Sequence, residues 1–190
     1  RVVVEDGVYD EFVSRLVERV EALGVGDPAD PATDVGPLVD EAAAERVSAW
    51  IDEAVGAGAE VLTGGTRDGL TVAPTVLAQV PADAKVVREE VFGPVLVLQR
   101  VADTDAAFAA VNDSDFGLQA GVFTRDLHTA FRAHRELEVG GVIIGDVPTF
   151  RADQMPYGGV KGSGVGKEGV RAAMTDLTYE RVMVLTGLDL

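Results

Sequence analysis

The sequence has no cysteine, only two histidines, and few basic residues: 16 Lys and Arg against 32 Asp and Glu. Without cysteine, this chain can form no disulfide, thiolate metal site or cysteine nucleophile. His128 and His134 lie six positions apart in a helix-like stretch, which is not a metal-ligand spacing, so we expect no metal site. The net charge of −16 argues against nucleic acid and anionic membranes as partners.

Long hydrophobic runs are also absent. No stretch of about 18 apolar residues occurs, so we expect no membrane-spanning helix. The first residues, RVVVEDG, lack the layout of a signal peptide, and we expect a cytoplasmic protein. A chain that starts with Arg1 and enters a β-branched run at once is expected to be a segment of something longer.

The pattern that is present favours a single α/β domain over residues 1–190. Segments with apolar residues three and four positions apart alternate with short β-branched runs, which predicts a mostly parallel twisted sheet flanked by helices. We expect helices at residues 8–24, 41–57, 103–111 and 127–137, and one from about residue 167. We expect strands at residues 2–4, 60–62, 94–101, 121–124 and 141–144.

Three further segments carry specific expectations. Residues 70–80 form a strand pattern that Pro74 interrupts, so we expect an edge or bent strand. Residues 146–165 are expected to form a long polar loop. Residues 179–185 read as a final apolar strand, available for pairing with another chain.

The stretch GVKGSGVGKEGV, residues 159–170, contains a G-x-G-x-x-G pattern. A dinucleotide-binding loop needs a strand that ends directly in the glycines, yet the preceding strand lies roughly twenty residues upstream. A phosphate-binding loop would need glycine in place of Lys161 and a hydroxyl in place of Glu168. We therefore interpret these glycines as a turn that permits positive φ before a helix, not as a nucleotide site.

Several blocks together resemble the aldehyde dehydrogenase family, in its order and spacing and over essentially the whole chain. The block EEVFGPV at residues 89–95 is the most specific of them. The others are RVVV (1–4), YDEF (9–12), TDVGPL (33–38), GAEVLTGG (58–65), Asn112, FGL (116–118), AGVFT (120–124) and PYGGVKGSGVGKEG (156–169).

The resemblance implies the C-terminal, catalytic-domain portion of an enzyme that oxidises a small aldehyde with NAD or NADP. In that family a cysteine thiolate adds to the aldehyde, a hydride passes to the nicotinamide, and water hydrolyses the thioester. The nucleophilic cysteine, the general-base glutamate and the Rossmann domain would lie upstream of Arg1, so this chain alone is expected to be inactive.

Two residues of the EEVFGPV block would contact the cofactor. The resemblance implies that Glu90 accepts hydrogen bonds from the nicotinamide ribose and that Phe92 packs against the nicotinamide ring. The alternatives are a surface pair, Glu89 and Glu90, and a core phenylalanine.

The loop at 146–157 would line the substrate entrance, with Phe150 and Tyr157 as walls. Arg151 would hold the anionic or hydroxylated tail of a small aldehyde, because a guanidinium fork suits a carboxylate or phosphate. The alternative is a surface pairing of Arg151 with Asp153.

One departure and one alternative remain. Gly145 stands where the family usually has asparagine, which puts the local geometry or the competence of the parent enzyme in doubt. The alternative function is a non-catalytic interaction module that retains the fold and the assembly surface. The resemblance implies a homo-oligomer, either a dimer or a tetramer.

Overall fold

The structure is a computed structural model, and it describes residues 1–187. The chain divides into two compact units, Arg1–Val111 and Asn112–Leu190, which we call the first and second unit. Each unit is described separately, and the single domain expected from the sequence stays a prediction.

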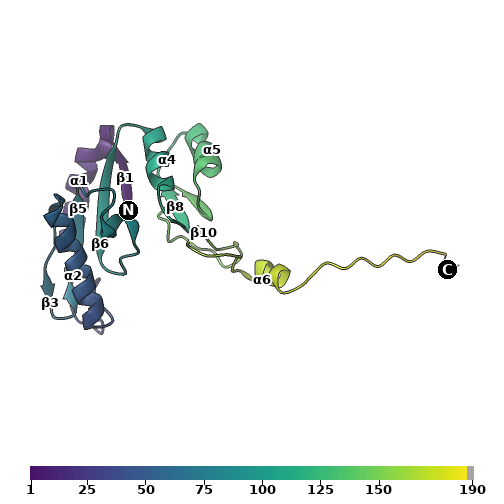
Figure 1. Ribbon diagram of the computed structural model, residues 1–190, viewed down its shortest axis with the longest axis horizontal. Coiled ribbons are helices and arrows are strands. Elements are labelled where there is room, and N and C mark those ends of the chain that lie inside the picture. The colour runs from purple at the N-terminus through teal and green to yellow at the C-terminus, as the bar shows by residue number, and fades with distance from the viewer. Residues whose placement is uncertain (188–190) are drawn as a thin grey trace. The chain divides into compact units, whose positions relative to one another are not determined.

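The first unit contains a four-stranded mixed sheet with the order β1-β6-β5-β2 (Figure 1). Its strands are β1 (Val2–Glu5), β6 (Val95–Val101), β5 (Thr75–Ala78) and β2 (Glu60–Thr63). β6 pairs in parallel with both β1 and β5, and only β2 runs antiparallel at its edge. The mostly parallel sheet expected from the sequence is confirmed for this unit.

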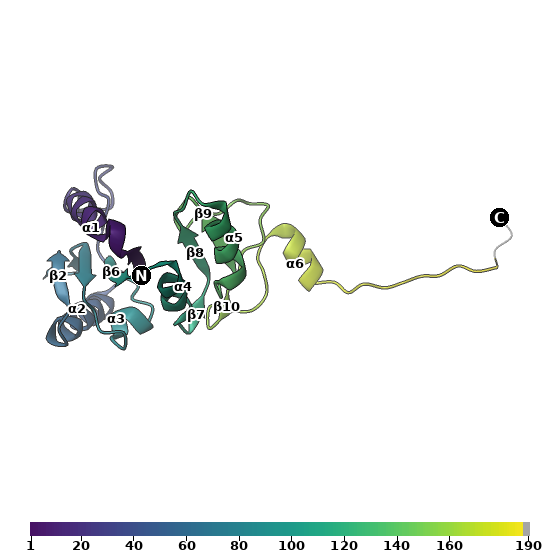
Figure 2. The ribbon, with the colours of Figure 1, turned by 90° about the horizontal axis from the view of Figure 1, so that it is seen from above.

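Helices cover both faces of this sheet. They are α1 (Asp6–Glu21), α2 (Glu41–Gly56) and the short α3 (Lys85–Arg88). A fourth helix, α4 (Thr104–Asn112), follows β6 and runs to the first residue of the second unit. Val97 packs in the cluster under α2, whereas its neighbour Leu98 lies beside Val13 of α1, so α1 and α2 lie on opposite faces (Figure 2). No helix within residues 1–187 is both long and apolar enough to cross a membrane.

The core of the first unit is built on one face of α2. Ala44, Val47, Ile51 and Ala54 recur at helical spacing and are at most 3% exposed. They form one cluster with buried strand residues, including Leu77. Burying this apolar face stabilises the unit through the hydrophobic effect.

The segment around Pro74 corrects one expectation. It is not an edge strand: β5 lies between β6 and β2, and all four of its residues are buried. The pattern divides at Pro74 into β5 and the short β4 (Thr71–Val72), which pairs with β3 (Arg67–Asp68). Because proline falls between the two strands, its missing N–H costs the central strand no hydrogen bond.

The second unit is built around a βαβ element. β8 (Gln119–Val122) pairs in parallel with β9 (Gly141–Ile144), and α5 (Leu127–Glu136) connects them (Figure 2). The expected loop at 146–165 contains a short strand, β10 (Val160–Lys161), which pairs antiparallel with β7 (Phe116–Gly117). The last helix, α6 (Val170–Asp176), begins three residues later than expected.

The strand expected at residues 179–185 does not form in the described part of the chain, where these residues have no assigned secondary structure. Tyr179, Val182 and Met183 are each more than 80% exposed. A strand needs a partner for its backbone groups, and no segment of residues 1–187 pairs with this one (Figure 2).

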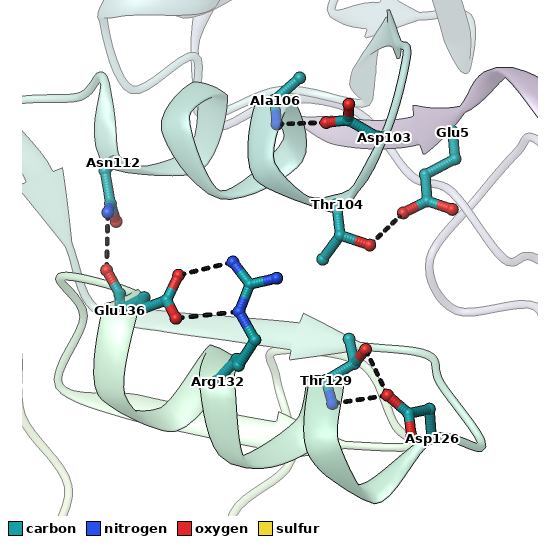
Figure 3. Close-up of polar contacts among 9 residues, drawn as sticks. All are labelled: Glu5, Asp103, Thr104, Ala106, Asn112, Asp126, Thr129, Arg132 and Glu136. Carbon is teal, nitrogen blue, oxygen red and sulfur yellow. Dashed lines mark hydrogen bonds and ion pairs between the residues drawn. The ribbon is translucent and has the colours of Figure 1, made fainter.

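Asp126 caps the N-terminus of α5, and its removal should destabilise the second unit. Its carboxylate accepts hydrogen bonds from the backbone N–H and the hydroxyl of Thr129 at 2.8 and 2.7 Å (Figure 3). The Thr129 hydroxyl, followed by the backbone, lowers the pKa of Asp126 below its ordinary value of 3.8. We expect Asp126→Ala to lower the thermal unfolding midpoint, and Asp153→Ala, an exposed aspartate of the same unit, to leave it unchanged.

The pH dependence of this effect has a definite sign. A carboxyl with a lowered folded pKa contributes stability above its unfolded pKa and loses it as the pH falls through the folded value. The difference between wild type and Asp126→Ala should therefore be full above pH 3.8 and shrink below it. A difference that grows on acidification contradicts the assignment.

Gly93, just before β6, lies directly against the core. A Cβ at this position would be 2.8 and 3.0 Å from the two Cγ atoms of the fully buried Val47. We expect Gly93→Ala to lower the free energy of unfolding by about 1–3 kcal/mol, as overpacking does. In Gly56→Ala, where a Cβ meets nothing within 4 Å, we expect no loss. Urea titration followed by circular dichroism measures both, and equal stabilities would contradict the packing argument.

Candidate functional site

The segment between α3 and β6 contains one partly buried side chain flanked by exposed ones. Val91 is partly buried and packs on the α2 cluster. Glu90 is exposed, and Phe92 is 71% exposed. Phe92 is therefore not a core phenylalanine, while the exposure of both Glu89 and Glu90 fits a surface pair as well as a binding role.

Phe92 has an unusual backbone conformation. Its φ of +47° lies in the left-handed region, which bulky side chains rarely adopt. Such a residue costs of order 1–3 kcal/mol and persists only where its surroundings impose it. On the C-terminal side, the Val95 N–H donates to the Gly93 carbonyl and the Thr75 N–H to the Pro94 carbonyl, both at 2.8 Å. The strained turn is thus tied to the sheet.

These exposed side chains fit the two halves of a nicotinamide riboside. The Glu90 carboxylate can accept two hydrogen bonds from vicinal hydroxyls, and the Phe92 ring offers an uncovered apolar face. Both project from a backbone held by the core beneath it. The residues present are therefore chemically suited to that part of a dinucleotide.

In the second unit, the loop after β9 brings three side chains together. Arg151 Nη2 donates to Glu168 Oε2 at 2.9 Å, and its guanidinium carbon lies 4.5 Å from the centre of the Tyr157 ring. Tyr157 and Glu168 also exchange two backbone hydrogen bonds, at 3.1 and 2.6 Å. We call these three residues the Arg151 cluster. Within residues 1–187, Arg151 has its ion pair with Glu168 and not with Asp153, so the alternative pairing is wrong.

Glu168 was missed as a site residue. Seventeen positions separate it from Arg151, and the sequence gives no periodic signal that connects them. The only available signal was a lone carboxylate within a glycine-rich turn.

Phe150 lies in a stretch of the same loop that is fixed to β8. The Gln119 side-chain amide donates to the carbonyls of Pro148 and Phe150 at 2.7 and 3.1 Å. The Phe150 side chain is 46% exposed, as a wall of an open site would be. Glu90 and Phe92 belong to the first unit, whereas Phe150, Arg151 and Tyr157 belong to the second.

Gly145 follows β9 with a φ of +82°. Glycine adopts this conformation freely, and asparagine does so more readily than most residues. A Cβ there would meet nothing within 4 Å. The backbone conformation thus suits the glycine of this chain best and also accommodates the usual asparagine.

The glycine-rich stretch is used for close packing. A Cβ on Gly140 would lie 1.7 Å from the Gly158 carbonyl oxygen, and one on Gly159 would lie 2.4 Å from the Ser163 Cβ. Gly164, Gly166 and Gly169 all have positive φ. These contacts support a structural turn, although the helix after it begins at Val170 and not near Lys167.

Both lysines of this stretch make internal contacts. Lys161 Nζ donates to the carbonyls of Asn112 and Ser114, at 2.8 and 3.1 Å, and pairs with Glu138 at 2.7 Å. Lys167 Nζ donates to the Gly158 carbonyl at 2.9 Å. These contacts hold the turn to its surroundings within the second unit.

Asn112, a single-residue element of the resemblance, has a structural role. Its side-chain amide donates to the Glu136 carbonyl at 2.7 Å (Figure 3). The amide oxygen accepts from the Glu138 N–H at 2.8 Å. These two bonds satisfy the backbone where α5 ends. Within the described residues, no three acidic or histidine side chains gather to hold a metal ion.

Comparisons with known proteins agree with this arrangement. Residues 1–183 match the model of the aldehyde dehydrogenase family. A 3-sulfolactaldehyde dehydrogenase of Priestia aryabhattai is 49% identical over 185 residues, which cover 97% of this chain and 39% of that protein.

Two solved structures have the same fold. Aldehyde dehydrogenase 21 from Physcomitrella patens, in complex with the reaction product succinate, has a TM-score of 0.90 and 44% identity, over 92% of this chain and 36% of that one. Glyceraldehyde-3-phosphate dehydrogenase GapN from Methanocaldococcus jannaschii, complexed with NADP, has a TM-score of 0.87 and 37% identity, over 92% of this chain and 38% of that one.

The chain spans about two fifths of the length of the curated relatives that it matches. The family model covers nearly all of it, and the identities and the fold agree with the motifs quoted above. The chain belongs to the aldehyde dehydrogenase family.

Proposed function

We propose that this chain is the part of an NAD(P)-dependent aldehyde dehydrogenase that positions the nicotinamide end of the cofactor and recognises a small anionic aldehyde. The observation that carries the proposal is the Arg151 cluster, in which a half-exposed guanidinium already holds a carboxylate at 2.9 Å. A site that binds the Glu168 carboxylate has the chemistry to bind a carboxylate or sulfonate of a substrate.

The cofactor role rests on Glu90 and Phe92. When bound, NAD or NADP supplies the hydride acceptor. Glu90 orients the ribose through its hydroxyls, and Phe92 provides a flat face that limits the orientations of the nicotinamide. The nucleophilic thiol has to come from outside this sequence, since the sequence has no cysteine. We therefore expect the isolated chain to be inactive.

The substrate role rests on the loop at 146–157. Arg151 binds the anionic tail, Tyr157 holds the guanidinium plane by stacking, and Phe150 forms a wall. The similar proteins support this class: one is a 3-sulfolactaldehyde dehydrogenase, and the structure of another is a complex with its reaction product succinate. Both molecules, 3-sulfolactaldehyde and succinate, are small and carry an anionic group, a sulfonate in the first and a carboxylate in the second.

A second candidate function is assembly without catalysis. The tail at 179–185 favours it, because its exposed apolar side chains and unpaired backbone are suited to pairing with another subunit's sheet. The same tail could equally join the subunits of an active enzyme, and we propose a cytoplasmic homo-oligomeric dehydrogenase, either a dimer or a tetramer, in preference to a module without catalysis.

The cofactor role predicts the effect of Glu90→Gln in the complete enzyme. An amide accepts weaker hydrogen bonds from the ribose than a carboxylate does, so hydride transfer in a single turnover should slow by about tenfold. Glu89→Gln, the neighbouring exposed carboxylate, is the matched control and should change little. Stopped-flow absorbance of the reduced cofactor measures both, and an unchanged rate in Glu90→Gln rejects the assignment.

The substrate role predicts a selective loss in Arg151→Met. We expect kcat/KM for succinic semialdehyde to fall by about tenfold to a hundredfold, the loss of a charged hydrogen bond, and that for neutral propionaldehyde to change little. Glu168→Gln removes the competing carboxylate and should lower the KM for the anionic aldehyde only. Arg125→Met, an exposed arginine of the same unit, is the control. Equal losses for both aldehydes in Arg151→Met would refute anion recognition.

A further inference from the structure

Arg46 of α2 contacts the peptide between the two proposed cofactor-binding residues. Its Nη1 donates to the carbonyl oxygen of Val91 at 2.7 Å, and the contact is partly buried. Forty-five positions separate the two residues, so this is a tertiary contact and not a local turn. The accepting carbonyl belongs to the residue that follows Glu90 and precedes Phe92.

The Arg46 guanidinium also stacks on the ring of Trp50. This tryptophan lies one helical turn further along α2, and the guanidinium carbon is 5.0 Å from the centre of its ring. Trp50 itself packs on the core cluster. A planar guanidinium that stacks on an aromatic ring and donates to a carbonyl has little rotational freedom.

The orientation of the Phe92 side chain depends on the position of the Val91 carbonyl. Fixing this carbonyl fixes the plane of the peptide that enters Phe92, and φ of Phe92, at +47°, then sets the direction of the ring. On the other side, Gly93 lies against Val47. The strained residue is therefore clamped at both ends by the same helix, through Arg46 and Val47.

We propose that Arg46 is a positioning residue for the cofactor side chains, one that holds Glu90 and Phe92 in their binding orientation through the Val91 carbonyl. The proposal rests on the cofactor role proposed above. It differs from a general role in stability, because Arg46 lies at the partly exposed border of the core, and the buried face of α2 is formed by other residues. Loss of the arginine releases the turn while the helix stays packed.

The first experiment tests the order of the turn without any cofactor. In Arg46→Met of the 190-residue chain, we expect faster deuterium uptake in peptides covering residues 89–93 and unchanged uptake in α2. Arg46→Lys keeps a hydrogen-bond donor but loses the planar guanidinium, so its deuterium uptake at residues 89–93 should lie between those of wild type and Arg46→Met. Trp50→Leu leaves the donor in place and should have a smaller effect. Arg15→Met, which removes an exposed arginine of α1 paired with Glu11, is the matched control. Unchanged uptake at residues 89–93 in Arg46→Met overturns the proposal.

The second experiment tests the consequence in the complete enzyme. Arg46→Met should raise the Kd for the preferred dinucleotide, measured by titration calorimetry, and slow single-turnover hydride transfer, each by about tenfold. The KM for the aldehyde should not change, and Arg46→Lys should recover part of both losses. A purely structural role would lower the unfolding midpoint without this selectivity, which would count against the proposal.

The two proposals fail in distinguishable ways. If Glu90→Gln and Phe92→Ala leave Kd and hydride transfer unchanged, the proposed cofactor role is wrong, and the positioning role falls with it. If those variants lose function and Arg46→Met does not, only the positioning role of Arg46 is wrong. Should Arg46→Met fail to fold, Arg46→Lys and Trp50→Leu provide the same comparison.

Discussion

The contact of Val47 with Gly93 is the constraint on which the first unit depends. Val47 is fully buried in the face of α2 that closes the core, and Gly93 has to approach it without a side chain of its own. Because Gly93 lies two residues before the first residue of β6, this contact helps to place the start of that strand relative to the helix. Glu90 and Phe92 lie in a turn whose neighbouring residues, Val91 and Gly93, pack against the core. A change in the packing of the core would therefore also move the candidate binding surface.

In the second unit, a long glycine-rich loop is held in place. It is held by side chains that donate to backbone carbonyls: Asn112 and Lys161 bind the main chain of segments distant in sequence, and Lys167 binds the Gly158 carbonyl within the loop. The glycines allow the backbone segments to approach closely, and the lysines donate hydrogen bonds to carbonyl oxygens in and beside the loop. A loop fixed in this way can present Arg151 and Tyr157 in a defined position.

Much of the fold could be predicted from patterns that are local in sequence. The apolar spacing at residues 41–57 predicted the helix that is α2, and the apolar run at 94–101 predicted the strand that is β6. What could not be predicted depends on contacts between distant residues. The sequence carries no sign that Arg151 would find Glu168 rather than Asp153, or that Pro74 would fall between two strands. The positive φ of Phe92 is likewise imposed by its neighbours, against the preference of the residue itself.

Trp50 is the only tryptophan in the sequence, and it lies against the guanidinium that holds the Val91 carbonyl. The intrinsic tryptophan emission of this chain therefore arises at one known place, between helix α2 and the turn that carries Phe92. A cation stacked on an indole ring alters its emission, so any event that displaces the guanidinium changes the signal of the whole chain. Trp50 is thus an intrinsic fluorescence probe that lies beside the guanidinium bound to this turn.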